Sequence, residues 1–332
     1  MNVRNFPRFF LLFTATVAAQ SLFALGSRET PSAGIVFRLG VLKGPTGIGM
    51  VRVFETRPEL VGGDTLELQA VASADAMAAK LVAGELDAAV LPVNMAAKLY
   101  TSGLPYRMAA VVGMGMVSVV TTDPDIRTFE DLKGREVHVA GQGATPEYLI
   151  RTIAESRGLD SEKDLTLAFR LPYPEIAASL VAGRISLAVL PEPFATQVLI
   201  GNPSARTPFS LDELWKAAVG RPGYPMSVFV IRDSLVRDRT ASVRALMDAY
   251  AASIAWVRGH PADAGILVEK HELGLKSAVA SAAIPRSAYV FIPASEARAD
   301  VEALLSVFLK IEPKSVGGRL PDPGFYAEIP RR

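Results

Sequence analysis

The sequence predicts an α/β fold with two lobes, in which each lobe is a mainly parallel sheet flanked by helices and two hinge strands join the lobes. Short apolar segments alternate with amphipathic ones between residues 36 and 200, which is the pattern of parallel strands connected by helices. A twelve-residue segment also recurs about a hundred residues further along the chain. The 332 residues, of which 50% are hydrophobic and 21% charged, supply enough apolar material for two globular units.

The first cycle of strands and helices occupies residues 36–120. The expected strands are residues 36–42, 65–71, 87–91 and a long apolar run at 108–120, and the expected helices are residues 48–54, 76–83 and 94–100. The glycine-rich turn Lys43-Gly44-Pro45-Thr46-Gly47 follows the first strand, and Ser73 stands where a helix cap is expected.

The second cycle begins after the turn at residues 121–124. Its expected strands are residues 137–140, 165–171 and 185–190, and its expected helices are residues 145–157, 174–182 and 193–200. One more strand, at residues 226–231, precedes a region that reads as almost wholly helical, with helices at 242–258, 262–271, 278–284 and 295–310. The Pro/Gly-rich residues 317–332 are expected to loop over the surface.

The repeat indicates two related lobes. Residues 81–92 and residues 180–191 are identical at eight of twelve positions, and in both a glycine ends a helix before an apolar strand that stops at a proline. A spacing of this size is a domain period. Because ligands bind at the carboxyl ends of parallel strands, two such edges facing each other would form a cleft. A favoured helix–strand unit used twice is the alternative explanation of the repeat.

The amino terminus has the pattern of a secretory signal peptide. Arg4 and Arg8 precede the apolar run at residues 9–19, and small residues follow at 24–27. The run is too short for a membrane span, although an N-terminal anchor is the alternative. The sequence therefore predicts a signal peptide at 1–26, a discontinuous first lobe at 35–120 and 225–332, and a second lobe at 121–224.

Charge and composition exclude several classes of function. With 35 Lys plus Arg against 34 Asp plus Glu, the chain has no basic field for nucleic acid, so no nucleic-acid partner is expected. The absence of cysteine rules out disulfides, thiol nucleophiles, cysteine-held metals and lipid attachment through cysteine. No metal and no cofactor are expected.

Enzyme motifs are not evident. The three histidines, His138, His260 and His271, lack the spacing of a zinc hydrolase, and the turns contain neither a nucleophile elbow nor a phosphate-binding P-loop. Gly141-Gln142-Gly143 follows a strand but has Pro146 at the third glycine position of a dinucleotide fingerprint. The sequence therefore predicts a non-enzyme.

Several segments resemble a known family. Residues 129–137 (Phe-Glu-Asp-Leu-Lys-Gly-Arg-Glu-Val), the turn at 141–143, residues 180–183 and Pro191-Glu192-Pro193-Phe194 are similar to the solute-binding proteins of ABC importers, in particular the group that takes up nitrate, taurine, alkanesulfonates and thiamine-precursor pyrimidines. The resemblance extends from about residue 37 to residue 264. It implies a type II periplasmic-binding-protein fold, an extracytoplasmic location and an ABC permease as partner.

Positions that line the ligand cleft in that family can be carried over. They are Lys43, Gly44, Pro45, Thr46, Ser73, Asn94, Gln142, Thr145 and Glu192. Tyr224 joins them because a tyrosine beside a proline can stack on a planar ligand. The backbone N–H groups at the helix starts could hold an anion. For each of these residues a purely structural role remains open: tight turns for the glycines, helix caps for Ser73, Asn94 and Thr145, and a surface ion pair for Glu192.

The expected function is capture of a small polar or anionic organic solute, without chemistry, by a monomeric protein that delivers it to a permease. Two alternatives use the same scaffold. One is an enzyme resembling chorismate dehydratases, and the other is a ligand-sensing subunit of a receptor.

Overall fold

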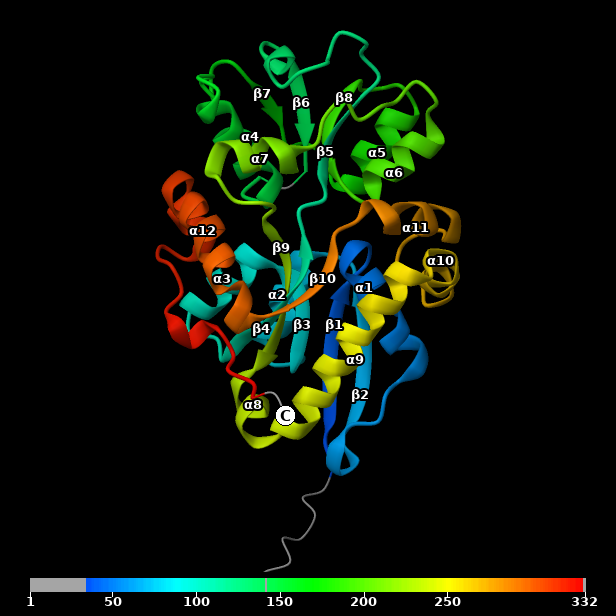
Figure 1. Ribbon diagram of the computed structural model, residues 1–332, viewed down its shortest axis with the longest axis vertical. Helices are drawn as coiled ribbons and strands as arrows, with labels where there is room; N and C mark the ends of the chain where they lie inside the picture. Colours follow the sequence, from blue (N-terminus) through cyan, green and yellow to red (C-terminus); the bar gives the residue numbers. More distant parts are fainter. Residues whose placement is uncertain (1–33, 141, 331–332) are drawn as a thin grey trace, which may run out of the picture. The chain divides into compact units, whose positions relative to one another are not determined.

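The computed structural model describes residues 34–140 and 142–330, which form two sheets with helices on their faces (Figure 1). The signal peptide predicted at residues 1–26 lies outside the described residues. Within these ranges no helix is both long and apolar enough to cross a membrane. The predicted α/β class with two lobes is confirmed.

The first sheet has six strands in the order β10-β4-β9-β3-β1-β2. β1 runs parallel to β2 and β3, whereas β9 is antiparallel to both of its neighbours and β10 is antiparallel to β4. The strands are β1 (Val36–Leu42), β2 (Thr65–Val71), β3 (Ala88–Pro92), β4 (Tyr106–Met114), β9 (Pro225–Arg232) and β10 (Tyr289–Pro293).

The second sheet has four strands in the order β5-β8-β6-β7. β6 is parallel to β7 and β8, and β5 is antiparallel to β8. The strands are β5 (Val117–Thr121), β6 (Glu136–Val139), β7 (Thr166–Ala168) and β8 (Leu187–Pro191). The sheet assignment of the strands agrees with two lobes, and the exact lobe boundaries stay a prediction.

Helices connect the strands and cover the sheets. Those of the six-stranded part are α1 (Pro45–Thr56), α2 (Ala74–Val82), α3 (Val93–Thr101), α8 (Asp233–Asp238), α9 (Thr240–Gly259), α10 (Pro261–Lys270), α11 (Ser277–Ala283) and α12 (Ala294–Ile311). Those of the four-stranded part are α4 (Thr145–Ser156), α5 (Tyr173–Val181), α6 (Phe194–Gly201) and α7 (Leu211–Val219).

The chain passes between the sheets twice. The first passage lies between β4 and β5, at Gly115 and Met116, and the second lies between α7 and β9. The apolar run at 108–120 is therefore two strands in two sheets. Gly115 permits this passage because a Cβ there would lie 2.5 Å from Asp212 Oδ1 and 2.8 Å from Tyr224 Cζ.

Three elements differ from the sequence-based expectation. The helix α7 was not expected, and β10 interrupts the region that reads as wholly helical. The segment after residue 317 does not simply loop over the surface. Phe325 is fully buried, and Ala327 N donates to Met108 O at 2.8 Å. The last described residues therefore extend the core of the six-stranded part.

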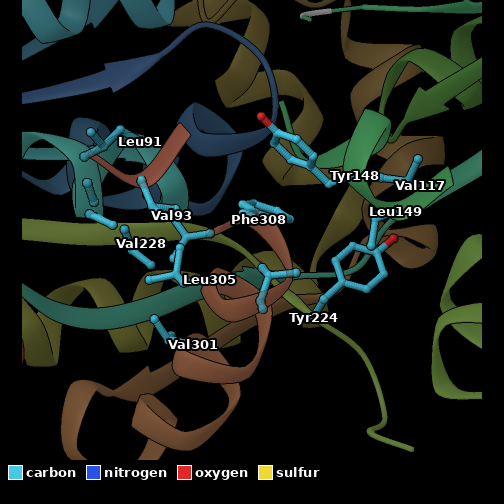
Figure 2. Packing of buried hydrophobic residues seen from close by; sticks show 14 of the residues in the cluster. Leu91, Val93, Val117, Tyr148, Leu149, Tyr224, Val228, Val301, Leu305 and Phe308 are labelled. Carbon is cyan, nitrogen blue, oxygen red and sulfur yellow. The ribbon is translucent and has the colours of Figure 1, made fainter. Parts of the chain in front are cut away.

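One apolar cluster contains residues from both sheets. Tyr148 of α4 lies toward Phe308 of α12 in Figure 2, and Leu149 of α4 lies beside Tyr224. The rings of Tyr148 and Phe308 have centroids 4.5 Å apart. Burial of these side chains stabilises the contact between the lobes.

Candidate functional site

The carboxyl ends of both sheets meet through four turns, each of which leads from a strand into a helix. The turns follow β1 and β3 in the six-stranded sheet and β6 and β8 in the four-stranded sheet. All the predicted cleft residues except Ser73 and Tyr224 lie in or beside these turns. The structure thus places the two sheet edges together, as ligand sites in open α/β sheets require.

The turn after β1 approaches the start of α6. A Cβ at Gly44, which has φ +102°, would lie 3.9 Å from Phe194 Cζ. The Phe194 ring itself stacks on Tyr173, with centroids 5.5 Å apart. The glycine at position 44 is therefore explained by its backbone conformation, and the contact with Phe194 of the other lobe is an ordinary one.

Lys43 and Thr46 have different environments in this turn. The Lys43 side chain is exposed, while its backbone N–H donates to Val71 O at 2.9 Å. The Thr46 side chain is buried; its hydroxyl donates to Leu42 O at 3.0 Å and accepts from Leu42 N at 2.8 Å. Thr46 therefore holds the end of β1 against the first turn of α1.

The start of α1 lies against two tyrosines. A Cβ at Gly49 would lie 3.6 Å from both Tyr250 Oη and Tyr289 Cδ1. The cavity beside Thr46 and these rings has a volume of only about 10 Å³. A Cβ at position 49 would meet these rings at ordinary contact distance, and the space next to Thr46 is nearly filled.

Asn94 and the turn after β6 form a contact between the lobes. Asn94 Nδ2 donates to Gly143 O at 3.2 Å. In the same turn, Gly143 N donates to Glu147 Oε2 at 2.7 Å, and Arg151 Nε donates to Glu147 Oε1 at 2.8 Å. Glu147 is 6% exposed, so a carboxylate of the chain itself covers the start of α4.

Glu192 connects the turn after β8 to the other sheet. The side chain is 3% exposed, and its Oε1 accepts from Arg286 Nε at 2.8 Å. Its Oε2 accepts from Thr196 N, at 3.1 Å, in the first turn of α6. Arg286 ends the 3₁₀ turn Ile284–Arg286 that precedes β10, so this ion pair joins the two lobes.

These hydrogen bonds argue against the predicted binding of an anion by backbone N–H groups at the helix starts. Gly44 N donates to Leu273 O at 2.8 Å, and the N–H groups of Gly143 and Thr196 are held by Glu147 and Glu192. An external anion would have to displace oxygens of the chain at each of these groups.

A larger cavity lies beside the passage between β4 and β5. Its volume is about 360 Å³, room for several water molecules or one small organic molecule. Arg286 lines it from the six-stranded side. The other lining residues are Met116, Ser118, Glu192, Thr207, Phe209, Ser210, Asp212 and Glu213.

Asp212 lines this cavity and lies beside Tyr224, which does not line it. Tyr224 is fully buried, and its hydroxyl and Asp212 Oδ1 are both shut off from solvent without a hydrogen bond of normal geometry to a described residue. Burial, followed by the negative charge of Asp212, raises the pKa of Tyr224 well above its ordinary value. Burial also raises the pKa of Asp212, and the charge of Glu213 adds to the rise.

The remaining predicted residues are placed as follows. Ser73 is exposed and accepts from Ala76 N at 3.2 Å as the cap of α2. Thr145 is 3% exposed at the first position of α4. Pro45 begins α1, and Gln142 is exposed, beside a second cavity of about 880 Å³ between α4 and the end of α12. A ligand contact at any of the predicted positions stays a prediction.

Sequence reasoning missed Asp212 and Arg286. Both lie in segments whose secondary structure the sequence analysis did not predict. Asp212 lies in the first turn of α7, and Arg286 lies just before β10. The Ser-x-Asp-Glu pattern at residues 210–213 is an N-cap signature, and Ser210 Oγ does accept from Asp212 N at 3.1 Å. Recognition of that cap could have placed Asp212 at a helix start. Among the described residues, no group of three His, Asp or Glu side chains is arranged to hold a metal ion.

Solved structures with the same architecture come from several organisms. An ABC transporter from Parabacteroides distasonis is 30% identical, with a TM-score of 0.77, and the alignment covers 88% of this chain and 99% of that chain. The periplasmic aliphatic sulphonate binding protein SsuA from Escherichia coli is 18% identical, with a TM-score of 0.66 and coverage of 87% and 92%. A ligand-binding component of an ABC-type import system from Staphylococcus aureus, solved with zinc bound, is 15% identical, with a TM-score of 0.65 and coverage of 90% and 99%.

Comparison with curated proteins gives no match. The model of the NMT1-like family matches residues 46–269, about two thirds of the chain, from the first turn of α1 to the end of α10. The matched segment includes most of the turns that meet between the two sheets and the whole of the four-stranded sheet. The chain therefore belongs to the NMT1-like family.

Proposed function

We propose that the chain is the extracytoplasmic substrate-binding component of an ABC importer, which captures a small polar solute between its lobes and delivers it to a permease. The observation that carries the proposal is that residues at the carboxyl ends of the two sheets contact each other in two places. Asn94 of one lobe contacts Gly143 of the other, and Arg286 contacts Glu192. A molecule held there touches both lobes at once.

Contact with both lobes is the physical requirement for transport by this route. A ligand shifts an open–closed equilibrium only if it binds one conformation more tightly than the other. A ligand that touched a single lobe would bind both conformations equally well. The two passages between the sheets are the places where such a rotation can occur.

The comparisons support this proposal. The Parabacteroides structure is described as an ABC transporter, and the Escherichia coli structure as a periplasmic binding protein for aliphatic sulphonates. We infer that no bond of the cargo is made or broken, because presentation to a permease needs only binding and release.

The proposal includes a location and partners. Residues 1–26 direct export and are removed, so that the mature chain begins near Ser27 without a cysteine for lipid attachment. The partners are the membrane subunits of the permease, and the protein acts as a monomer.

A thermal-shift screen of the chain from Ser27 onward tests the proposal. The panel contains sulfonates, nitrate, pyrimidines, flavins and amino acids. A ligand that binds only the native state stabilises it by about 2.7 kcal/mol at a hundredfold excess over its dissociation constant. We expect one chemical class to raise the melting temperature and to be recovered unchanged by mass spectrometry. Conversion of the stabilising compound into a product would contradict the proposal in favour of an enzyme.

A further inference from the structure

The cavity of about 360 Å³ has an excess of negative charge. Three carboxylates line it, from Glu192, Asp212 and Glu213, against the single guanidinium of Arg286. Arg286 is already paired with Glu192. No ion pair within the described part of the chain involves Asp212 or Glu213, so the excess charge belongs to these two residues.

Asp212 is the more constrained of the two. Its carboxyl group faces Gly115 and Tyr224, and its Oδ1 has no access to solvent. Glu213 is exposed and can be hydrated. A buried carboxylate without a cation is costly, and an opposite charge beside it removes much of that cost.

Carboxylates outnumber cations in the lining of this cavity, which also contains the hydroxyl groups of Ser118, Thr207 and Ser210. The backbone N–H of Thr196 is held by Glu192, and that of Asp212 by Ser210. Tyr224 is fully buried with its hydroxyl beside Asp212, and it is not among the residues that line the cavity. A ligand that brings N–H donors and a positive charge fits this set better than an anion does.

We propose that the cargo carries a cationic nitrogen group, an ammonium or amidinium, and that this group binds beside Asp212 in the cavity. The inference rests on the proposed function and narrows its substrate class. It narrows the expected polar or anionic solute to a cationic or zwitterionic one. Asp212 is then a specificity-determining residue, and the ion pair of Glu192 and Arg286 lines the same cavity.

Two pairs of probes test the proposal by isothermal titration calorimetry. Benzamidine is compared with benzamide, and taurine with isethionate, because each pair differs in the cationic nitrogen. We expect at least one cationic member to bind about tenfold or more tightly than its partner, and Asp212→Asn to abolish that preference. Asp75→Asn, an exposed carboxyl at the start of α2, is the matched control and keeps the preference.

Any other ranking overturns the proposal. This includes equal binding within both pairs, failure of both cationic compounds to bind, and an unchanged preference in Asp212→Asn. The proposed function fails differently: it is contradicted if a compound that binds is converted into a product. An anion that binds unchanged and raises the melting temperature would leave the importer function standing and refute the cationic cargo.

Discussion

Arg286 Nε lies 2.8 Å from Glu192 Oε1 and thereby ties the segment before β10 to the turn after β8. Glu192 is almost fully buried, whereas the Arg286 side chain is 44% exposed. The pair crosses from one lobe to the other. It therefore stabilises the conformation in which the two sheet edges meet.

Loss of Arg286 is expected to loosen this conformation. Arg286→Ala leaves the Thr196 N–H as the remaining partner of the Glu192 carboxyl among the described residues, and we expect a loss of about 1–3 kcal/mol in the free energy of unfolding. Urea denaturation measures it. Lys80→Ala, which breaks the exposed pair with Glu85, should change stability by less than about 1 kcal/mol. Equal effects of both substitutions would show that the Arg286–Glu192 pair has no special role.

Thr46 is expected to act on stability as well as on binding. Thr46→Ala removes the hydroxyl that donates to Leu42 O and accepts from Leu42 N, so it should lower the free energy of unfolding by about 1–2 kcal/mol. Thr46→Ser keeps the hydroxyl and should restore most of the loss. Urea titrations of both variants decide the matter. A Thr46→Ala protein as stable as the parent would mean that water replaces the hydroxyl.

Much of the fold was predictable because the strands around the core obey local rules. β1, β2, β3, β6 and β8 lie where apolar segments end at a turn or a proline, and the repeat at 81–92 and 180–191 corresponds to the pairs α2–β3 and α5–β8. The division of residues 108–120 could not be predicted in the same way. Both halves are apolar, and the break at Gly115 arises from a contact with Asp212 and Tyr224, which are distant in sequence.

The candidate site was predictable only in part, for a similar reason. The four turns follow from the carboxyl ends of parallel strands. Which atoms fill them depends on tertiary contacts. Arg286 reaches Glu192 across 94 positions of the sequence, and Tyr250 and Tyr289 pack against α1 beside Gly49. No pattern in the sequence around Gly49 predicts these contacts.

Gly115 is expected to tolerate no side chain. In Gly115→Ala the added Cβ would lie 2.5 Å from Asp212 Oδ1 and 2.8 Å from Tyr224 Cζ, so neighbouring groups must shift. Overpacking of this kind typically lowers stability by about 1–3 kcal/mol. Gly259→Ala, at the end of α9 with nothing within 4 Å of the added atom, is the control and should be neutral or stabilising. Melting temperatures of both variants give the answer, and a fully stable Gly115→Ala protein would be the contrary result.

Asp212 is expected to make stability depend on pH. Burial raises the pKa of its carboxyl, the adjacent Tyr224 opposes the rise, and the charge of Glu213 adds to it. The folded state therefore binds this proton more tightly than the unfolded state does. The contribution of Asp212 to stability is greatest below the unfolded-state pKa of about 3.9, and it falls as the pH rises through the folded-state pKa.

Asp212→Asn removes this pH-dependent loss. We expect the variant to be more stable than the parent at pH 7, with a difference that shrinks toward pH 3.5. Urea denaturation of both proteins at the two pH values measures the difference. A variant that is less stable at pH 7 would show that the carboxylate makes a favourable contact in the folded protein. If Asp212→Asn both gains stability and loses the preference for cationic compounds, Asp212 costs stability and serves binding.

The central claim is that a bound solute holds the two lobes together. Since the chain contains no cysteine, Ala178→Cys on α5 and Ala255→Cys on α9, both exposed positions, can carry one spin label each without competing thiols. Double electron–electron resonance then measures the distance between α5 and α9. With the compound that raises the melting temperature most, we predict that the distance distribution shifts and narrows to a single closed population. An identical distribution with and without saturating compound would contradict capture by lobe closure.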